Sequence, residues 1–167
     1  MLLAGWSLTL EMEMQIKVET EYGVKIPARA HSTDAGFDLA ASEPVILEAG
    51  LGNTLVHTGV HILIPEGYYG LVAPRSGLTR QGKVAEIGII DAGYTGEVCV
   101  TMRYEVHGLH LAGKDKTLLT TRKAFINAGD RIAQLLILPL PDVQLVAGSV
   151  TGTATSRGSN GFGSTGI

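Results

Sequence analysis

Residues 86–100 read Glu86-Ile87-Gly88-Ile89-Ile90-Asp91-Ala92-Gly93-Tyr94-Thr95-Gly96-Glu97-Val98-Cys99-Val100, and this stretch decides the fold. Apolar residues run into the segment 91–94 and alternating residues run out of it, which predicts two strands joined by a tight turn in a β-hairpin. Asp91 could serve as a base and Tyr94 as a stacking platform, between glycines that let other groups approach the backbone. Taken alone, the pattern favours an ordinary turn, with Asp91 bonded to its own backbone and Tyr94 in the core.

The composition indicates one β-rich domain. At 167 residues the chain can bury a full core, and its 22 glycines among abundant Val, Ile and Leu predict many short strands and tight turns. A net charge of −3 argues against general nucleic-acid binding, because a phosphate backbone needs a basic surface. Cys99 is the single cysteine, so we expect a small buried apolar residue rather than a disulfide or a cysteine metal site, in a reducing cytoplasm.

The order of strands follows from alternating apolar residues and turn signals. Residues 1–10 are apolar but lack a basic region and a cleavage site, and they are too short to span a bilayer, so we expect residues 1–13 to be a flexible extension. His57 and His61 lie on one face of a predicted strand, but no third ligand fits the pattern and they are assigned no role. Strands are predicted at 15–19, just before residue 41, and at 44–47, 54–64, 68–73, 97–106 and 117–126, and the stretch 129–139 starts with a turn and becomes strongly apolar.

A second chemical signal follows the strand 68–73. Arg75 offers a planar fork of donors, Ser76 a hydroxyl and Gly77 an unobstructed amide, as a phosphate oxygen requires where a strand ends at a short helix. Ser76 as a helix N-cap, with Arg75 on the surface, explains the same residues and is the safer interpretation of the segment alone.

The stretch 129–139 carries one polar residue within an apolar face. Arg131, Ala133 and Leu135 are expected on one face, and Gln134 interrupts the other. Because a buried amide needs partners, Gln134 either bonds backbone or points at a ligand.

The C-terminal segment is rich in glycine and serine. Such termini are usually flexible tails. The alternative is an arm that closes on a ligand, with Arg157 and the hydroxyl groups binding phosphates and Phe162 stacking on a base.

Five stretches occur in a fixed order, and together they resemble the motifs of the trimeric dUTP pyrophosphatase (dUTPase) family. They cover the chain from about residue 14 to the end. The stretches are Asp34-Ala-Gly-Phe-Asp38-Leu-Ala-Ala41, Pro74-Arg-Ser-Gly-Leu78, Gly88-Ile-Ile-Asp91-Ala-Gly-Tyr94-Thr-Gly96, Gly129-Asp-Arg-Ile-Ala-Gln134 and Arg157-Gly-Ser-Asn-Gly-Phe162-Gly-Ser-Thr-Gly166.

The resemblance implies an all-β, jelly-roll-like fold with at most one short helix, assembled as a homotrimer with C-terminal arm exchange. The β domain would span residues 14–150 and the arm residues 151–167. Each active site would combine the hairpin of one subunit, the phosphate-binding residues of a second and the arm of the third. The implied protein is cytoplasmic and binds neither nucleic acid nor membrane.

The implied reaction is hydrolysis of dUTP to dUMP and pyrophosphate, which limits uracil incorporation into DNA and supplies dUMP for dTTP synthesis. Asp91 would activate a water for in-line attack on the α-phosphorus. Tyr94 would pack on the deoxyribose and exclude a ribose hydroxyl, while backbone groups of the hairpin pair with uracil. Mg²⁺ would be held mainly by phosphate oxygens and waters, with Asp38 contacting it through water.

The resemblance also assigns the binding residues. Those for uracil and deoxyribose are Ala85, Gly88, Ile89, Ile90, Tyr94 and Phe162. Those for the phosphates are Arg75, Ser76, Gly77, Gln134, Arg157, Gly163, Ser164 and Thr165. Asp130 and Arg131 are expected to brace the site. Some family members have Asn where this chain has Ala85, so base recognition is expected to rest on backbone groups.

The segment from about 108 to 122 is longer than the minimal connection in the family. Similar insertions in some bacteriophage members suggest a phage origin and a regulatory protein partner, whereas a longer surface hairpin without function is the simpler explanation. A dCTP deaminase of the same fold is the alternative enzyme, but the pattern from Asp91 to Tyr94 and the arm with Phe162 favour the pyrophosphatase.

Overall fold

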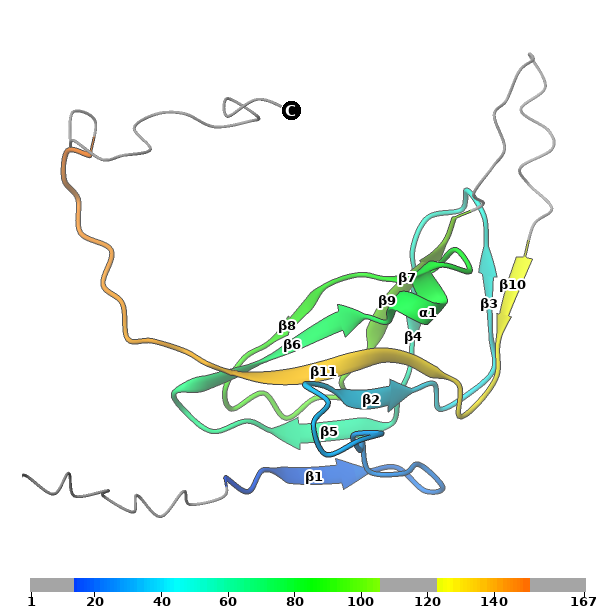
Figure 1. The fold of residues 1–167 in the computed structure, drawn as a ribbon, viewed down its shortest axis with the longest axis horizontal. Helices are drawn as coiled ribbons and strands as arrows, with labels where there is room; N and C mark the ends of the chain where they lie inside the picture. Colours follow the sequence, from blue (N-terminus) through cyan, green and yellow to red (C-terminus); the bar gives the residue numbers. More distant parts are fainter. Residues whose placement is uncertain (1–13, 106–122, 151–167) are drawn as a thin grey trace, which may run out of the picture.

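The computed structural model describes residues 14–105 and 123–150, and these are almost entirely β-structure (Figure 1). The single helix of these ranges is α1 (Ser76–Thr79). The strands are β1 (Lys17–Thr20), β2 (Phe37–Ala40), β3 (Val45–Glu48), β4 (Thr54–Val56), β5 (Val60–Leu63), β6 (Tyr68–Pro74), β7 (Lys83–Ala85), β8 (Gly88–Ile90), β9 (Val100–Tyr104), β10 (Lys123–Ile126) and β11 (Arg131–Pro139). The predicted all-β fold with one short helix is confirmed.

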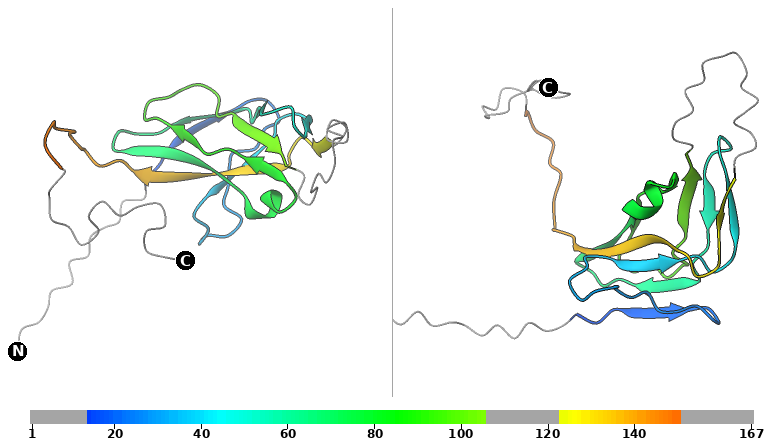
Figure 2. Two further views of the ribbon diagram at one scale, coloured as in Figure 1. Left: turned by 90° about the horizontal axis from the view of Figure 1, so that it is seen from above. Right: turned by 45° about the vertical axis from the view of Figure 1, so that its right-hand side comes forward.

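The strands form small antiparallel sheets. The largest has the order β2-β11-β6-β8, and a second has the order β4-β9-β7. Two further pairs, β1-β5 and β10-β3, complete the layers around the core (Figures 1 and 2). No pairing among the described residues joins two strands that are consecutive in sequence, so the fold depends on contacts that local patterns do not specify.

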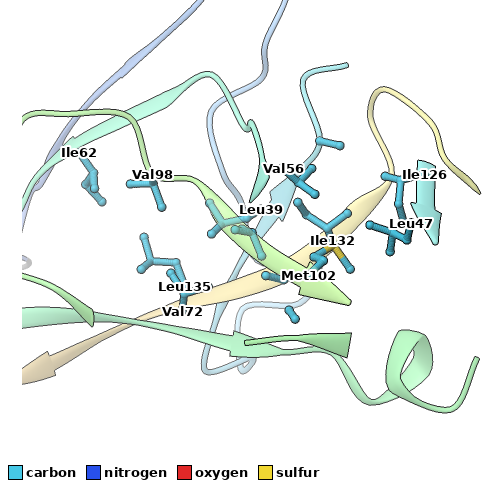
Figure 3. Close-up of a cluster of buried hydrophobic side chains, with 14 of the residues drawn as sticks. Leu39, Leu47, Val56, Ile62, Val72, Val98, Met102, Ile126, Ile132 and Leu135 are labelled. Carbon is cyan, nitrogen blue, oxygen red and sulfur yellow. The ribbon is translucent and has the colours of Figure 1, made fainter. Parts of the chain in front are cut away.

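The core lies between these sheets (Figure 3). Leu39, Ile132, Leu135, Val72 and Met102 are each almost completely buried and come from β2, β11, β6 and β9. They belong to one continuous apolar cluster that also contains Val98 and Val100. The strand that follows the turn 91–94 is therefore fixed by the core. Branched and unbranched aliphatic side chains fill this space, as expected from a composition poor in aromatics.

The predicted β-hairpin at 86–100 is wrong in its pairing. The strand before the turn, β8, pairs with β6, whereas the strand after it, β9, pairs with β4 and β7. The turn therefore passes from one sheet to the other. The apolar alternation on its two sides is real, but it reflects burial against two different neighbours.

The predicted strand 54–64 is divided into β4 and β5. The backbone N–H groups of Thr58 and Gly59 donate to the Glu97 carboxylate instead of a strand partner, at 2.9 and 2.7 Å. A side chain almost forty residues away thus breaks a strand that its own sequence favours.

The faces of β11 also differ from the simple alternation. The pairing with β2 shifts between Arg131 and Ala133, so a β-bulge places both Ile132 and Ala133 in the core and leaves Arg131 exposed. Arg131 does not share a face with Ala133 as predicted. Beyond the bulge the alternation resumes, with Leu135 buried and Gln134 half-buried.

Beyond β11 the chain leaves the body as an extended segment, residues 140–150 (Figures 1 and 2). Its apolar side chains are largely exposed, with Leu145 at 97% and Val146 at 86%. No helix of the described residues is long and apolar enough to cross a membrane.

Candidate active site

The turn that carries Asp91 is held firmly while its carboxylate stays free. The backbone N–H of Tyr94 donates to the Asp91 carbonyl at 3.2 Å, and the N–H of Gly93 donates to the Ile64 carbonyl at 3.0 Å. The Asp91 side chain is exposed and, among the described residues, takes part in no hydrogen bond or ion pair. The expectation that Asp91 bonds its own backbone therefore does not hold for its carboxylate.

Tyr94 lies beside this turn rather than in the core. Its side chain is 44% exposed, and its hydroxyl donates to the Glu97 carbonyl at 3.1 Å. A Cβ at Gly96 would collide with the Tyr94 ring and hydroxyl, so the ring position requires glycine there. The phenol is thus fixed with part of its surface open to a ligand.

Glu97 braces the segment after the turn, a role the sequence reasoning missed. One carboxylate oxygen accepts the N–H groups of Thr58 and Gly59, and the other lies 2.7 Å from His57 Nδ1. The buried hydroxyl of Thr58 donates to the Val98 carbonyl at 2.6 Å. The brace ties the segment 97–98 to the link between β4 and β5. No local signal marks this role, because both partners are distant in sequence.

The brace carries charge. Burial alone would raise the pKa of Glu97, but hydrogen bonds from His57, Gly59, Cys99 and Thr58 lower it to about 2. The hydrogen bond to Glu97 and its negative charge raise the pKa of His57. Burial and the Glu97 carboxylate raise the pKa of Cys99 to about 11. Cys99 is only partly buried, which corrects the expectation of a core residue.

Four predicted phosphate-binding residues line one recess of about 300 Å³. Arg75, Ser76 and Gly77 come from the end of β6 and the start of α1, and Gln134 comes from the adjacent strand β11. Leu78 and Gln81 complete the lining. Arg75, not Ser76, is the N-cap of α1, and no side chain caps the helix, so the Ser76 hydroxyl is not used as the predicted cap.

Asp38 orients the cationic side of this recess. Its two oxygens pair with Arg75 Nε and Arg131 Nη1, each at 3.0 Å, and Arg75 Nη1 donates to the Arg131 carbonyl at 2.8 Å. The Arg75 guanidinium is therefore held by two partners before any anion binds. Arg131 contacts both Asp38 and Arg75, and its predicted role in bracing the active site stays a prediction.

Gln134 is fixed by backbone and by a close neighbour. Its Nε2 donates to the Pro74 carbonyl at 3.1 Å, so the predicted backbone partner is present, and Gln134 also lines the recess. A Cβ at Gly36 would lie 2.9 Å from Gln134 Oε1, so Gly36 is needed for this packing. Gly36 belongs to the motif that contains Asp38, but its support of Gln134 could not be inferred from sequence.

The turn and the recess lie at opposite ends of β6 in one chain. Ile90 pairs with Gly70, which places Asp91 near Tyr69, whereas Arg75 follows the other end of the strand. Six residues of extended chain span about 20 Å. Asp91 and Arg75 of one chain are therefore too far apart to contact neighbouring atoms of one phosphate group.

Three of the predicted base-binding residues, Gly88, Ile89 and Ile90, form a free sheet edge. β8 is the last strand of its sheet, so one side of Gly88–Ile90 carries backbone N–H and C=O groups without a strand partner among the described residues. Ile89 is 58% exposed, while Ala85 is buried and paired with Met102. The Ala85 side chain thus faces the core. The remaining predicted residues lie outside the described residues, and so does the whole insertion at about 108–122; these residues are Arg157, Phe162, Gly163, Ser164 and Thr165.

The fold and site define an all-β protein in which a small recess with an arginine, a serine and a glutamine in its lining accompanies an exposed carboxylate on a turn held by backbone hydrogen bonds. The family model named dUTPase matches residues 23–105 and 117–166. The unmatched residues 106–116 overlap the predicted insertion. This chain belongs to the dUTPase family, and it is an enzyme of the dUTP diphosphatase class.

Proteins similar to this chain are named deoxyuridine 5′-triphosphate nucleotidohydrolase or dUTPase. The deoxyuridine 5′-triphosphate nucleotidohydrolases of Mycobacterium marinum and Mycobacterium tuberculosis H37Rv are 40% and 42% identical over 156 residues, which are 89% of this chain and 92% of each relative. The dUTPase of Staphylococcus bacteriophage 80alpha, solved as a point mutant with dUpNHpp, is 32% identical with a TM-score of 0.77, over 92% of this chain and 99% of that one. The phage phi11 dUTPase, described with a species-specific insert, is 29% identical with a TM-score of 0.69, over 84% of this chain and all of that one.

Proposed function

We propose that Asp91 activates the water that hydrolyses dUTP to dUMP and pyrophosphate. The Asp91 carboxylate accepts a proton from the water, whose oxygen bonds to the α-phosphorus as the bond to the bridging oxygen breaks. This assignment rests on one observation: backbone hydrogen bonds hold the turn, while no described residue forms a hydrogen bond or ion pair with the Asp91 carboxylate. A carboxylate already bonded to donors would be a weaker base.

The outer edge of β8 would read the base. Uracil presents a donor flanked by acceptors, and backbone groups of an edge strand offer complementary partners at fixed positions. Cytosine would leave such groups unpaired, which can discriminate by roughly 10⁴ or more. Tyr94, held by Glu97 and Gly96, would close the side of the pocket against the sugar. Phe162 is expected to stack from the C-terminal arm.

The recess of Arg75, Ser76, Gly77 and Gln134 would bind the phosphate groups. Arg75 is oriented by Asp38, so little side-chain entropy is lost when it forms hydrogen bonds with a phosphate. Its positive charge would stabilise the leaving pyrophosphate. Arg157, Gly163, Ser164 and Thr165 are expected to cover the phosphates from the arm.

The active site would be shared between subunits of a homotrimer. Within one chain, Asp91 and Arg75 lie about 20 Å apart along β6. The reacting phosphate can contact both groups only if they come from different chains. The exposed apolar side chains of residues 140–150, such as Leu145, support the same proposal, because a segment of this kind gains stability by packing on a neighbour.

Mg²⁺ is the proposed metal ion. Both oxygens of Asp38 already pair with arginines, so this residue fits a contact through water better than direct ligation. When bound, the ion would neutralise charge on the triphosphate, with phosphate oxygens and waters as its main ligands. The structural Mg(II) ion named for a point mutant of the phi11 dUTPase supports magnesium binding within the family.

Pyrophosphate release from each deoxynucleoside triphosphate tests the function. We expect release from dUTP alone, without ammonia from dCTP. Asp91→Asn should abolish turnover but retain binding of a non-hydrolysable dUTP analogue. Release of ammonia from dCTP, or full turnover by Asp91→Asn, would contradict the proposal.

Mixed trimers test the sharing of the site. We expect Asp91→Asn and Arg75→Ala each to be inactive alone. When the two chains are unfolded and refolded together, about one quarter of the sites combine an intact Asp91 with an intact Arg75 from different subunits. Activity near that fraction supports the shared site, and absence of recovered activity in refolded trimers refutes it.

A further inference from the structure

Three potential metal ligands meet outside the proposed dUTP site. Val56 of β4 pairs with Val100 of β9, so His57 and Cys99 are the next residues facing each other across these strands. Glu97 lies two residues before Cys99. His57 Nδ1 is 2.7 Å from Glu97 Oε2 and 3.6 Å from Cys99 Sγ, and the three ligand atoms all lie within 4.8 Å of one another.

We propose that His57, Glu97 and Cys99 form a binding site for a borderline divalent cation such as Zn²⁺. The ligands would be His57 Nδ1, Glu97 Oε2 and Cys99 Sγ, with a water molecule as the fourth. One nitrogen, one oxygen and one sulfur form a donor set that suits Zn²⁺ or Co²⁺. Mg²⁺ would not compete, because it prefers oxygen ligands alone.

The spacing is close to that of a tetrahedral site. Zinc bonds of ordinary length place neighbouring ligand atoms about 3.4–3.7 Å apart. The separation of His57 Nδ1 and Cys99 Sγ, 3.6 Å, already lies in that range. The pair of His57 and Glu97 is at hydrogen-bond distance and must open by about 0.7 Å to admit the ion. The His57 side chain is 48% exposed, so it can make this small movement.

The carboxylate is already oriented for this role. Glu97 Oε1 accepts the N–H groups of Thr58 and Gly59, which fixes the plane of the carboxylate and leaves Oε2 toward His57. Partners of this kind behind a ligand hold it in place and increase metal affinity. The exposed side of His57 leaves room for the water ligand.

The cluster is also complete without a metal, as a hydrogen-bonded pair of His57 and Glu97 beside a thiol. A cation would displace the protons of the imidazole Nδ1 and of the thiol, so binding would release protons to the solvent. A bond between the metal and Cys99 Sγ distinguishes a metal site from a hydrogen-bonded cluster that binds no metal. Such a bond does not depend on dUTP hydrolysis, so this inference and the proposed function can fail independently.

Cobalt titration of the full chain provides the test. After treatment with a chelator, we expect one Co²⁺ per chain to bind with a thiolate-to-cobalt charge-transfer band in the near ultraviolet. Zn²⁺ should displace it and Mg²⁺ should not. Zn²⁺ should also slow alkylation of Cys99 in the unaltered protein, a measurement that needs no variant. Absence of the band, or alkylation at an unchanged rate, would overturn the proposal.

Variants locate the site. Cys99→Ser should lose the band and bind Co²⁺ at least about tenfold more weakly, because even indirect partners of a metal ligand contribute that much. His61→Gln is the matched control, since its ring contacts the Thr95 carbonyl and no cluster residue. The double replacement of His107 and His110, outside the described residues, should leave the band unchanged. If the double replacement removes it, or Cys99→Ser keeps it, the proposed ligands are wrong.

Discussion

Replacing Glu97 with alanine would remove the acceptor for two backbone N–H groups in the link between β4 and β5. Thr58 and Gly59 are buried, and the bonds to Glu97 measure 2.9 and 2.7 Å. The carboxylate side chain is only 19% exposed. After the substitution the two N–H groups would lose their partner at a position that water reaches poorly.

The expected loss of stability follows from these two bonds. A hydrogen bond to a charged group contributes about 1.5–3 kcal/mol, and partial access of water reduces the sum, so we expect Glu97→Ala to lower the free energy of unfolding by about 3 kcal/mol. The contact between Glu97 and the exposed His57 side chain adds nothing to this value. Glu97→Gln keeps a carbonyl acceptor and should lose about half as much or less.

Urea unfolding at equal protein concentration, with a chelator present, measures these differences. Glu48→Ala is the matched control, because among the described residues its partly exposed carboxylate pairs with Lys123 alone, and its removal should cost less than about 1 kcal/mol. If Glu97→Ala and Glu48→Ala unfold at the same urea concentration with equal slopes, the brace does not stabilise the fold and the reasoning is refuted.

Four further outcomes are expected. Gly96→Ala should displace Tyr94 and lower kcat/KM for dUTP by about tenfold or more, as a misplaced site group does, while raising relative turnover of UTP. Gly36→Ala should push Gln134 from its position and raise KM for dUTP more than it lowers kcat; an unchanged KM would contradict this. The pKa of Glu97 falls from its ordinary value of 4.5 to about 2 in the folded protein. The free energy of unfolding should therefore decrease as the pH drops from 4.5 toward 2, and Glu97→Gln should remove this contribution. The raised pKa of His57 gives a pH dependence of the opposite sign. The stabilisation from protonated His57 is complete below pH 6.5 and is lost as the pH rises through the raised pKa, and His57→Gln should abolish this dependence.

The residues of the phosphate recess could be predicted together because the sequence keeps most of them together. Arg75, Ser76 and Gly77 are consecutive, so any strand-to-helix corner brings their donors to one place. Gln134 joins them because β11 pairs with β6, with Gln134 facing Ala73. That pairing was not visible in the alternation of either strand, and only the resemblance to a family grouped Gln134 with the other three residues.

The turn shows where local patterns fail. Apolar alternation indicates that β8 and β9 are strands with a buried face, but it does not indicate which strand each of them pairs with. The hairpin was the simplest partner assignment and it was wrong. The division of the segment 54–64 has the same origin, since the cause is Glu97, a side chain that becomes a neighbour only after the sheets assemble.

Two kinds of contact would set the geometry of the proposed site. The brace by Glu97 and the contact of Gly96 with Tyr94 fix the turn relative to its own chain. Within one chain β6 holds Asp91 and Arg75 about 20 Å apart, so that chain alone does not bring them together. If the site is shared, the distance from base to phosphate is set by subunit packing alone. Substitutions at the turn should then change which nucleotide is hydrolysed, whereas substitutions in the subunit interface should change the rate for dUTP without changing that preference.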